Sequence, residues 1–399
     1  MSPEFQSAQR ISDVTISDIV IMSEAARARR AEGHHVISLG IGEPDFNTPQ
    51  HVNEAAINAI NNHDTQYPPI AGKPALKAAV AALYDTASPD QVLVSSGSKY
   101  TILNGFLASL NDGDEVVVPA PFWTSYADII RLCGAKVVIV PTHAEDGFQL
   151  DANALRAAMT PKTRWLLINS PSNPTGAVMG ADKLKEIGDV LADFPRCWLM
   201  SDEIYQHLTY GIDFASAWDV LPQLRDKMLI TNGVSKAYAM TGWRVGFGIG
   251  PQNLIKAMTT VQAQGTSGTC SIAQAAALAA LTGPQDLLEE RRQSFLMRRD
   301  LVLNHLHAMD GITTPTPEGA FYTFSSWQDL KGGITPQGQV LETDRDFCQY
   351  ILEAANTTII PGTGFAAEGH FRISYASSVD DLNQALSQMA EAVAAIKRP

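Results

Sequence analysis

The segment Gly233–Phe247, GVSKAYAMTGWRVGF, places Lys236 among small residues and Arg244 eight positions later, between two strand-like runs. A lysine in a turn with few other charges can have the pKa of its amine lowered and can attack an aldehyde, although a lysine at this point can also be an ordinary surface residue. Arg244 opens the apolar run RVGFGIG, where an unpaired guanidinium is costly to bury. Arg244 therefore favours an anionic partner, and a phosphate accepts its two parallel N–H groups.

On both sides of this segment, short β-branched runs alternate with amphipathic helical patterns. Strands are predicted over 36–41, 91–95, 115–118, 136–140, 164–169, 197–201, 228–232 and 244–249. Helices are predicted over 24–32, 48–62, 75–84, 98–110, 182–193 and 252–262, with Thr48 as the cap of the second and Pro49 at its first position. Such alternation is typical of a mostly parallel sheet with helices on both faces.

The pattern changes from about Glu289 onward. A long charged helix is predicted through Met309, followed by isolated strands over 320–324, 357–360 and 371–375 and by a closing helix from Val379. The Gly- and Pro-rich stretch 332–338 indicates a surface loop. These features predict a second, smaller α+β domain.

Length and charge limit the classes of function. The 399 residues exceed the usual size of one core, so at least two domains are expected. The formal net charge of −13, with 29 Lys and Arg against 42 Asp and Glu and no long basic run, makes nucleic acids and anionic membranes poor partners. An anionic ligand must then be held by local groups.

The cysteines and the N-terminus favour a cytoplasmic protein. Cys133, Cys197, Cys270 and Cys348 lie far apart and form no zinc-like pair, so we expect free buried thiols and no metal site. The first residues contain no apolar signal-peptide core. The longest apolar stretch, 272–281, is about half the length of a membrane span.

Two further segments follow predicted strands. After the strand 91–95 the chain runs through a Gly-Ser turn into a helix at Ser98, and backbone N–H groups at such a helix start favour an anion. The rigid turn NSPSNPTGA, residues 169–177, presents Asn173 at the carboxyl end of the next strand, where open α/β sheets hold ligands. Each segment alone is also compatible with a plain turn.

The third such segment is SDEIY, residues 201–205, directly after the strand 197–201. Asp202 places a carboxylate at the same sheet edge, and Tyr205, one helical turn further on, can face the same ligand. An aspartate that caps a helix is the alternative interpretation of Asp202.

A lysine for an imine, an arginine for a phosphate, an aspartate for a pyridine nitrogen and Asn and Tyr donors for a phenolic oxygen together match pyridoxal 5′-phosphate. These motifs resemble those of the class I pyridoxal-phosphate-dependent aminotransferases of fold type I, most of all the bacterial aspartate aminotransferase subgroup. The resemblance extends from LGIGEPDF at Leu39 to FRISYA at Phe371. It implies an α/β fold, with a large domain that holds a mostly parallel seven-stranded sheet between helices and a smaller α+β domain. We predict an N-terminal arm and part of the small domain over 1–45, the large cofactor-binding domain over 46–289, and the C-terminal small domain over 290–399.

The resemblance also implies roles for the catalytic residues. Lys236, in the pattern GxSKxxxMxGxRxG, would bind the cofactor aldehyde and carry the proton between the substrate Cα and the cofactor. Asp202 would pair with the pyridinium nitrogen, while Asn173 and Tyr205 would donate hydrogen bonds to the ring oxygen.

Other positions would hold the remaining parts of cofactor and substrate. Trp123, in APFWTSY, resembles the aromatic residue that stacks on the ring. Arg372, in HFRISYA, resembles the arginine that binds the substrate α-carboxylate, with Gly42, Trp123 and Asn173 nearby. The phosphate would lie on the backbone of Ser98 and Lys99, with Ser235 and Arg244. Tyr67 resembles a tyrosine that reaches the phosphate of the neighbouring subunit, which implies a homodimer with shared sites.

The implied reaction is ping-pong transfer of an amino group between an L-amino acid, with aspartate favoured, and a 2-oxo acid such as 2-oxoglutarate. In the subgroup, an N-terminal KPSAT stretch supplies a lysine for a distal acid, whereas this chain has Val14 at the corresponding position of SDVTIS. Lys99 is another cation for that role. Aromatic or other neutral amino acids remain alternative substrates.

Two other classes of activity remain for comparison. A β-lyase or a decarboxylase of the same fold would use the same Lys236 and Asp202, and its products distinguish it from an aminotransferase. A dinucleotide-binding oxidoreductase is disfavoured, because GFGIG at Gly246 lacks the third spaced glycine and is followed at once by Pro251.

Overall fold

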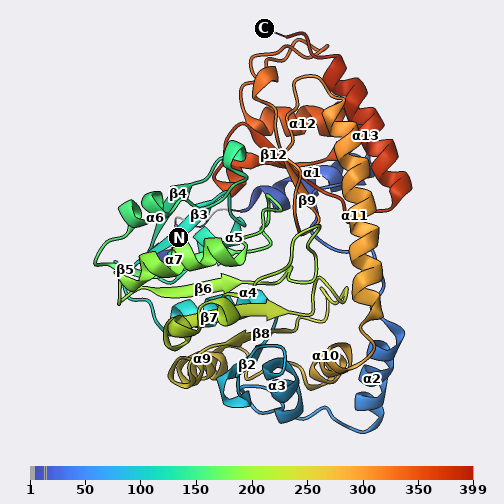
Figure 1. The fold of residues 1–399 in the computed structure, drawn as a ribbon. Helices are drawn as coiled ribbons and strands as arrows, with labels where there is room; N and C mark the ends of the chain where they lie inside the picture. Colours follow the sequence, from blue (N-terminus) through green and yellow to red (C-terminus); the bar gives the residue numbers. More distant parts are fainter. Residues whose placement is uncertain (1–4, 13, 15, 399) are drawn as a thin grey trace.

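A seven-stranded sheet forms the centre of the larger part of the protein (Figure 1). The structure is a computed structural model that describes residues 5–12, 14 and 16–398. The strand order is β2-β8-β7-β6-β5-β3-β4, and the predicted mostly parallel sheet is confirmed. The strands are β2 (Val92–Ser95), β3 (Glu115–Ala120), β4 (Lys136–Pro141), β5 (Thr163–Asn169), β6 (Trp198–Asp202), β7 (Met228–Gly233) and β8 (Gly246–Ile249).

Strand direction determines where the side chains of the site gather. Strands β4, β3, β5, β6 and β7 are mutually parallel, and β8 runs antiparallel to β7 and β2. Asn169 and Asp202 are the last residues of β5 and β6 and are register partners, so their side chains start from one sheet edge. This edge is where α/β sheets hold ligands.

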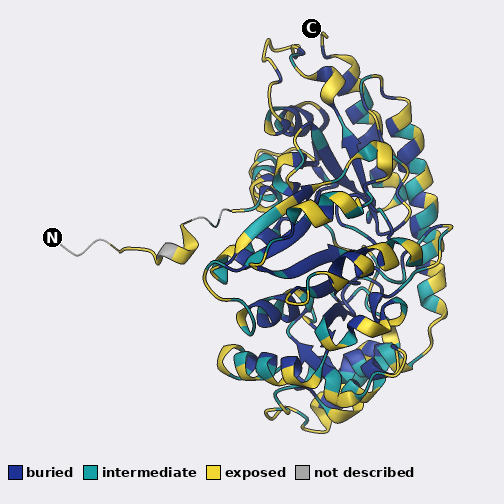
Figure 2. Cartoon of the chain, turned by 60° about the vertical axis from the view of Figure 1, so that its left-hand side comes forward, coloured by how far each residue is buried: buried dark blue, intermediate teal, exposed yellow. Residues whose placement is uncertain are grey.

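Helices cover both faces of this sheet, and alternate residues of each strand enter two different cores. In β2, Val92 and Val94 belong to one core and Leu93 to the other. Figure 2 shows the strands buried and the outer helix faces exposed. The helices are α2 (Gln50–Asn61), α3 (Pro74–Ala81), α4 (Ser98–Leu107), α5 (Ser125–Leu132), α6 (Ala152–Ala158), α7 (Ala181–Ala192), α8 (Ala217–Val220), α9 (Gln252–Gly265) and α10 (Ser271–Thr282).

The predictions for two of these elements were wrong in detail. Helix α2 begins at Gln50, and Thr48 does not cap it, because its hydroxyl donates a hydrogen bond to the Ala239 carbonyl. Strand β8 begins at Gly246 rather than at Arg244, which has a φ of +56° in the preceding turn. A Cβ on Gly246 would lie 2.2 Å from the Ser98 amide nitrogen, so the strand begins where only glycine fits against α4.

The smaller part has its own core, shared by the two ends of the chain. Met22, Val36 and Leu39 pack there with residues of the C-terminal third such as Phe295 and Ile373. Strands β11 (Ile360–Pro361), β12 (His370–Ser374) and β9 (Tyr322–Ser326) form an antiparallel sheet, and β1 (Ile37–Ser38) pairs with β10 (Thr357–Thr358). Its helices are α1 (Asp18–Ala31), α11 (Asp286–His307), α12 (Asp344–Ala355) and α13 (Val379–Ala394).

Helix α11 runs from the level of α10 up to α13 and so extends along both parts (Figure 1). Short 3-10 helices complete the fold at Gln9–Ile11, Pro89–Gln91, Ala144–Asp146, Pro222–Lys227, Gln328–Leu330 and Gly362–Phe365. No helix among the described residues is long and apolar enough to cross a membrane.

The cysteines have free thiols, but the expectation that all are buried was wrong. Cys197 and Cys348 are buried and Cys133 is partly buried, whereas Cys270 is exposed. Cys270 directly precedes the first turn of α10, outside the packed face of that helix.

Candidate active site

A pocket of about 550 Å³ opens at the carboxyl edge of the large sheet, beside the small sheet. Eight of the predicted site residues line it: Gly42, Ser98, Trp123, Asn173, Asp202, Tyr205, Lys236 and Arg372. Ile19, Tyr126, Asn169, Ile204 and Tyr322 complete the lining. The fold thus brings together side chains from positions 19 to 372 of the chain.

Lys236 lies in the turn that follows β7, and its amine donates a hydrogen bond of 2.6 Å to the Gly42 carbonyl. Burial, together with the positive charge of Arg372, lowers the pKa of Lys236 to about 8. A fraction of the amine is therefore neutral slightly above pH 7. A neutral amine is the form that can attack a carbonyl carbon or accept a proton.

Asp202 is buried at the end of β6 and faces the same pocket. Its carboxylate accepts a 2.6 Å hydrogen bond from the Tyr126 hydroxyl and one of 3.3 Å from the Ile204 amide. Burial raises the pKa of Asp202 to about 6, against the lowering effect of these donors and of Lys236. The group is thus ionised at neutral pH and can pair with a cationic ligand group. No helix begins at Asp202, which excludes the helix-cap interpretation.

Arg372 is 1% exposed in the middle of β12, which excludes a solvent-facing arginine. Its Nη1 donates a 2.8 Å hydrogen bond to the Asn173 side-chain oxygen, and its Nη2 donates to the Gly40 carbonyl. Its Nε has no partner among the described residues. Both acceptors are uncharged, so a buried positive charge faces the pocket without a counter-charge. Such a group is stabilised by an anionic ligand.

Tyr322 is in contact with Arg372. The guanidinium carbon of Arg372 lies 4.5 Å from the centroid of the Tyr322 ring and 5.0 Å from that of the Phe365 ring. The Tyr322 hydroxyl also forms a 2.7 Å hydrogen bond with that of Tyr205. A Cβ on Gly42 would lie 2.2 Å from the Tyr322 hydroxyl. Tyr322 therefore holds Arg372, Tyr205 and the Gly42 backbone at fixed relative positions.

Arg244 is exposed and lies in the turn before β8, so the expectation of a buried strand arginine was wrong. Its Nη1 donates a 2.9 Å hydrogen bond to the Thr241 carbonyl. A Cβ on Gly97 would lie 2.3 Å from the Arg244 Nη2, so the guanidinium packs against the backbone just before α4. Arg244 and the first N–H groups of α4, which starts at Ser98, thus face a common region suited to an anion.

The remaining predicted residues do not line the pocket. Lys99 is exposed, and its ammonium lies 4.7 Å from the centroid of Trp123, which does line the pocket. Ser235 is buried directly before Lys236. Tyr67 is 89% exposed and lies in a separate groove with residues 65–68 and 266–272. Val14 also lies outside the pocket lining.

The sequence reasoning missed Tyr126 and Tyr322. A signal for Tyr126 was available, because it follows Trp123 by three residues in FWTSY, and the two rings meet edge to face at 5.4 Å. Tyr322 belongs to an aromatic strand, AFYTF, whose letters do not distinguish a core position from a position in the pocket.

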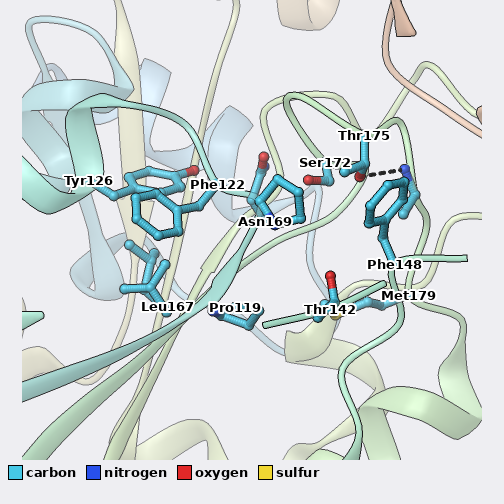
Figure 3. A pocket seen from close by; sticks show the side chains of 13 residues that line it. Pro119, Phe122, Tyr126, Thr142, Phe148, Leu167, Asn169, Ser172, Thr175 and Met179 are labelled. Carbon is cyan, nitrogen blue, oxygen red and sulfur yellow. Dashed lines mark hydrogen bonds between the residues drawn. The ribbon is translucent and has the colours of Figure 1, made fainter. Parts of the chain in front are cut away.

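A second cavity of about 420 Å³ adjoins the pocket at the same sheet edge (Figure 3). Tyr126 and Asn169 line both. The remaining lining is mostly apolar, from Phe122, Phe148 and Met179 among others, and the Thr175 hydroxyl accepts a 3.1 Å hydrogen bond from the Ala177 amide. The residues that line this cavity include Tyr126 and no charged group.

Comparisons with known proteins point to one family. The family described as aminotransferase class I and II matches residues 34–389. The aspartate aminotransferase of Rhizobium meliloti (strain 1021) is 47% identical over 97% of this chain and 96% of its own length. A probable aspartate/prephenate aminotransferase of Rhizobium leguminosarum bv. phaseoli is 47% identical over 95% of this chain and 96% of its own length.

Solved structures show the same similarity in three dimensions. The crystal structure of the aspartate aminotransferase from Rhizobium meliloti superposes with a TM-score of 0.96 at 46% identity, covering 99% of this chain and all of that one. The Thermus thermophilus aspartate aminotransferase with maleate superposes with a TM-score of 0.90 at 38% identity, covering 98% of this chain and all of that one. The likeness therefore includes both parts of the molecule.

Proposed function

This chain belongs to the family of class I and II aminotransferases and has their fold type I architecture, and we propose that it transfers the amino group of L-aspartate to a 2-oxo acid such as 2-oxoglutarate. The transfer would take place in two half-reactions at one site, with pyridoxal 5′-phosphate as the carrier. The observation that carries the proposal is the meeting of Lys236, Asp202 and Arg372 in one pocket.

The groups present fit this cofactor. Lys236 supplies an amine with a pKa of about 8 for its aldehyde, and Asp202 supplies a buried carboxylate for its pyridinium nitrogen. Arg244 against the start of α4 supplies an anion site for its phosphate. We assign Ser98, the Lys99 backbone and Ser235 to the same phosphate, Asn173 and Tyr205 to the ring oxygen, and Trp123 to the ring face. When bound, the cofactor withdraws electrons from the substrate Cα, so that its proton can leave.

The chain's own residues then bind the substrate and move the proton. Arg372 binds the α-carboxylate through its unpartnered Nε side, and the Asn173 oxygen keeps the guanidinium plane in place. With the cofactor bound, the Lys236 Nζ would be the base that accepts the proton leaving the substrate Cα and would hold it for return on the same side of the site. Asp202 stays ionised at neutral pH, because Tyr126 donates to its carboxylate.

Preference for aspartate requires a cation for the second carboxylate. We assign this role to Lys99, whose ammonium lies over the Trp123 ring at the pocket. The solved Thermus thermophilus enzyme, which binds the dicarboxylate maleate, supports the choice of an acidic substrate. Val14, where the subgroup has lysine, cannot serve this carboxylate.

Prephenate is a second candidate acceptor, because relatives that are 41–47% identical carry the name aspartate/prephenate aminotransferase. The apolar Ile19 and Trp123 in the pocket lining suit its ring. Aromatic amino acids are the corresponding alternative donors.

We propose that the enzyme works as a homodimer. Tyr67 is almost fully exposed and lies outside its own pocket. In a symmetric pair, Tyr67 of each protomer would donate a hydrogen bond to the phosphate held by the other protomer. The exposed groove around Tyr67 would then be covered by the second copy.

The proposal is tested by mixing the purified, cofactor-loaded protein with single amino acids and 2-oxo acids and identifying the products. Wild type should convert aspartate to its 2-oxo acid without releasing ammonia, and Lys236→Ala should lose at least about 10⁴-fold in turnover. Release of ammonia and pyruvate would identify a β-lyase, and transamination by Lys236→Ala would refute the assignment. Comparing aspartate with phenylalanine, and 2-oxoglutarate with prephenate, determines the substrate preference.

A further inference from the structure

Helix α11 contacts each residue of a short segment, 45–47, that connects the two parts of the molecule. Arg291, Phe295 and Arg298 follow one another at spacings of four and three residues, so they form one stripe on the helix. The Arg298 Nη1 donates to the Asp45 carboxylate at 2.7 Å, and the Phe295 ring meets the Phe46 ring edge to face at 5.4 Å. The Arg291 Nη2 donates to the Asn47 carbonyl at 2.9 Å.

Arg291 also reaches the loop that carries Lys236. Its Nη1 donates a 2.8 Å hydrogen bond to the carbonyl of Ala237, the residue directly after Lys236. Arg291 is only 9% exposed, and its carbon lies 5.1 Å from the centroid of the Phe46 ring. One buried guanidinium therefore joins two carbonyl oxygens that are 190 positions apart in the chain.

The two backbone segments that Arg291 joins also contact each other directly. The Lys236 amine donates to Gly42, the Thr48 hydroxyl donates to the Ala239 carbonyl at 2.8 Å, and the Trp243 Nε1 donates to the Thr48 hydroxyl oxygen at 3.0 Å. The loop 236–243 and the segment 42–48 thus form one seam at the pocket. Arg291 ties this seam to α11, the helix that extends along both parts of the molecule.

We propose that Arg291 is a positioning residue, which fixes the backbone next to Lys236 so that its amine stays aligned with the substrate Cα. The inference rests on the proposed function, because it assigns Lys236 the proton transfer. Without Arg291, the Asn47 and Ala237 carbonyl oxygens lose their donor, while the loop keeps its contacts with the segment 42–48 and the hydrogen bond from the Tyr238 hydroxyl to Gln285. A displacement of about 1 Å at a reacting group can cost about a hundredfold in rate.

The variants Arg291→Met and Arg291→Lys test this role, with Arg292→Met as the matched control. Arg292 lies on the same helix but pairs with the exposed Glu289 at 2.6 Å and donates to the Thr209 carbonyl at 3.3 Å, so its removal deletes a charge and a carbonyl contact without touching the seam. A lysine at position 291 keeps the charge but presents a single nitrogen, whereas arginine places two separate nitrogens, Nη1 and Nη2, on the two carbonyl oxygens.

Each variant is measured as the dimeric, cofactor-loaded protein, with active sites counted from the lysine-bound cofactor. For Arg291→Met we expect kcat to fall about tenfold to a hundredfold with KM for the amino acid within about twofold, because Arg291 does not line the pocket. The pH at which the absorption band of the lysine-bound cofactor changes should also shift, since the Lys236 nitrogen is displaced. For Arg291→Lys, kcat and the pH of the band change should lie between those of wild type and Arg291→Met. For Arg292→Met, both should equal the wild-type values.

A merely structural role would lower the melting temperature or the fraction of loaded sites but leave kcat per site and the band titration unchanged. That result overturns the inference. If Arg291→Met does not fold, the same two readouts on Arg291→Lys decide, and values equal to wild type overturn it. Absence of the absorption band and of transamination in wild type would instead refute the proposed function, which keeps the two failures distinct.

Discussion

The candidate site has one end, at Arg372, that the chain encloses by itself and another, at Arg244 outside the pocket lining, that it leaves open to solvent. At the enclosed end, Arg372 is held by Asn173, Gly40 and two aromatic rings before any ligand arrives. At the open end, Arg244 is exposed, donates a hydrogen bond to the Thr241 carbonyl and packs against the backbone before α4. The enclosed end is thus preorganised by burial, whereas the open end depends on the ligand and, in the proposed homodimer, would also be covered by a second copy of the chain.

The two ends differ in how strongly their charges interact with a ligand, because water and salt screen them to different extents. Buried charges interact strongly because little water screens them, and each is costly without a partner. Exposed charges interact weakly and are screened by salt. Substitutions at the enclosed end should therefore have large effects that salt does not change, and those at the open end should have small effects that salt does change.

The largest effect is expected for Arg372→Met. Loss of a buried, charge-assisted partner of the substrate carboxylate should cost about 2–5 kcal/mol, which lowers kcat/KM for every amino acid by roughly 30-fold to several thousandfold. Steady-state kinetics at two salt concentrations measure this loss in kcat/KM. The affinity for the cofactor should not change. Arg131→Met, which removes an exposed arginine paired with Asp128, is the control. A loss confined to acidic substrates would mean that Arg372 binds the distal carboxylate instead.

An intermediate effect is expected for Asp202→Asn in the cofactor-free protein. The folded-state pKa of Asp202 is raised from 3.8 to about 6, so the folded state binds its proton more tightly than the unfolded state does. This contribution to stability is present below pH 3.8 and is lost as the pH rises through about 6. At pH 8 the buried carboxylate therefore destabilises the protein, and the amide should raise the free energy of unfolding by about 1–3 kcal/mol.

Denaturant unfolding at pH 8 and at pH 4 measures this gain, which should vanish at the lower pH. The loaded enzyme should show the reverse, because the carboxylate then has a cationic partner and its removal weakens cofactor binding. Equal stability of the two cofactor-free proteins at pH 8 would show that Tyr126 and Ile204 already compensate the buried charge.

The same division explains what could be predicted from the sequence. The strands and their order of appearance were accessible from local patterns. So were Asp202, which comes directly after an apolar run, and Asn173, which lies in the rigid turn after an earlier such run, because the end of a buried strand lies at the sheet edge. The role of Arg372 was accessible only through a family pattern, because its alternation with Phe371 and Ile373 is equally compatible with a solvent-facing arginine, whereas β12 is buried on both faces. The position of Arg244 was wrong, because the start of β8 depends on contact between Gly246 and α4, which lies 148 positions earlier.

Contacts between distant segments account for the rest. Tyr322 reaches Gly42 and Tyr205, and Arg291 reaches Asn47 and Ala237, through pairings that no local pattern encodes. Local periodicity determines which residues face inward, but it does not determine which inward residue meets which. Residues that act by positioning others are therefore the hardest to find from a single sequence.

The smallest effect is expected for Arg244→Gln at the open end. Because the guanidinium is exposed and the α4 N-terminus still offers N–H groups to the phosphate, the substitution should weaken cofactor affinity by about 1–2 kcal/mol, or roughly five- to thirtyfold. The wild-type affinity should fall with rising salt more steeply than that of the variant, because the screened charge is gone. Equilibrium titration of the cofactor-free protein with pyridoxal 5′-phosphate at two salt concentrations measures both. A loss as large and as salt-independent as that of Arg372→Met would show that a second copy buries this end too, and the contrast between the two ends would then hold only for the isolated chain.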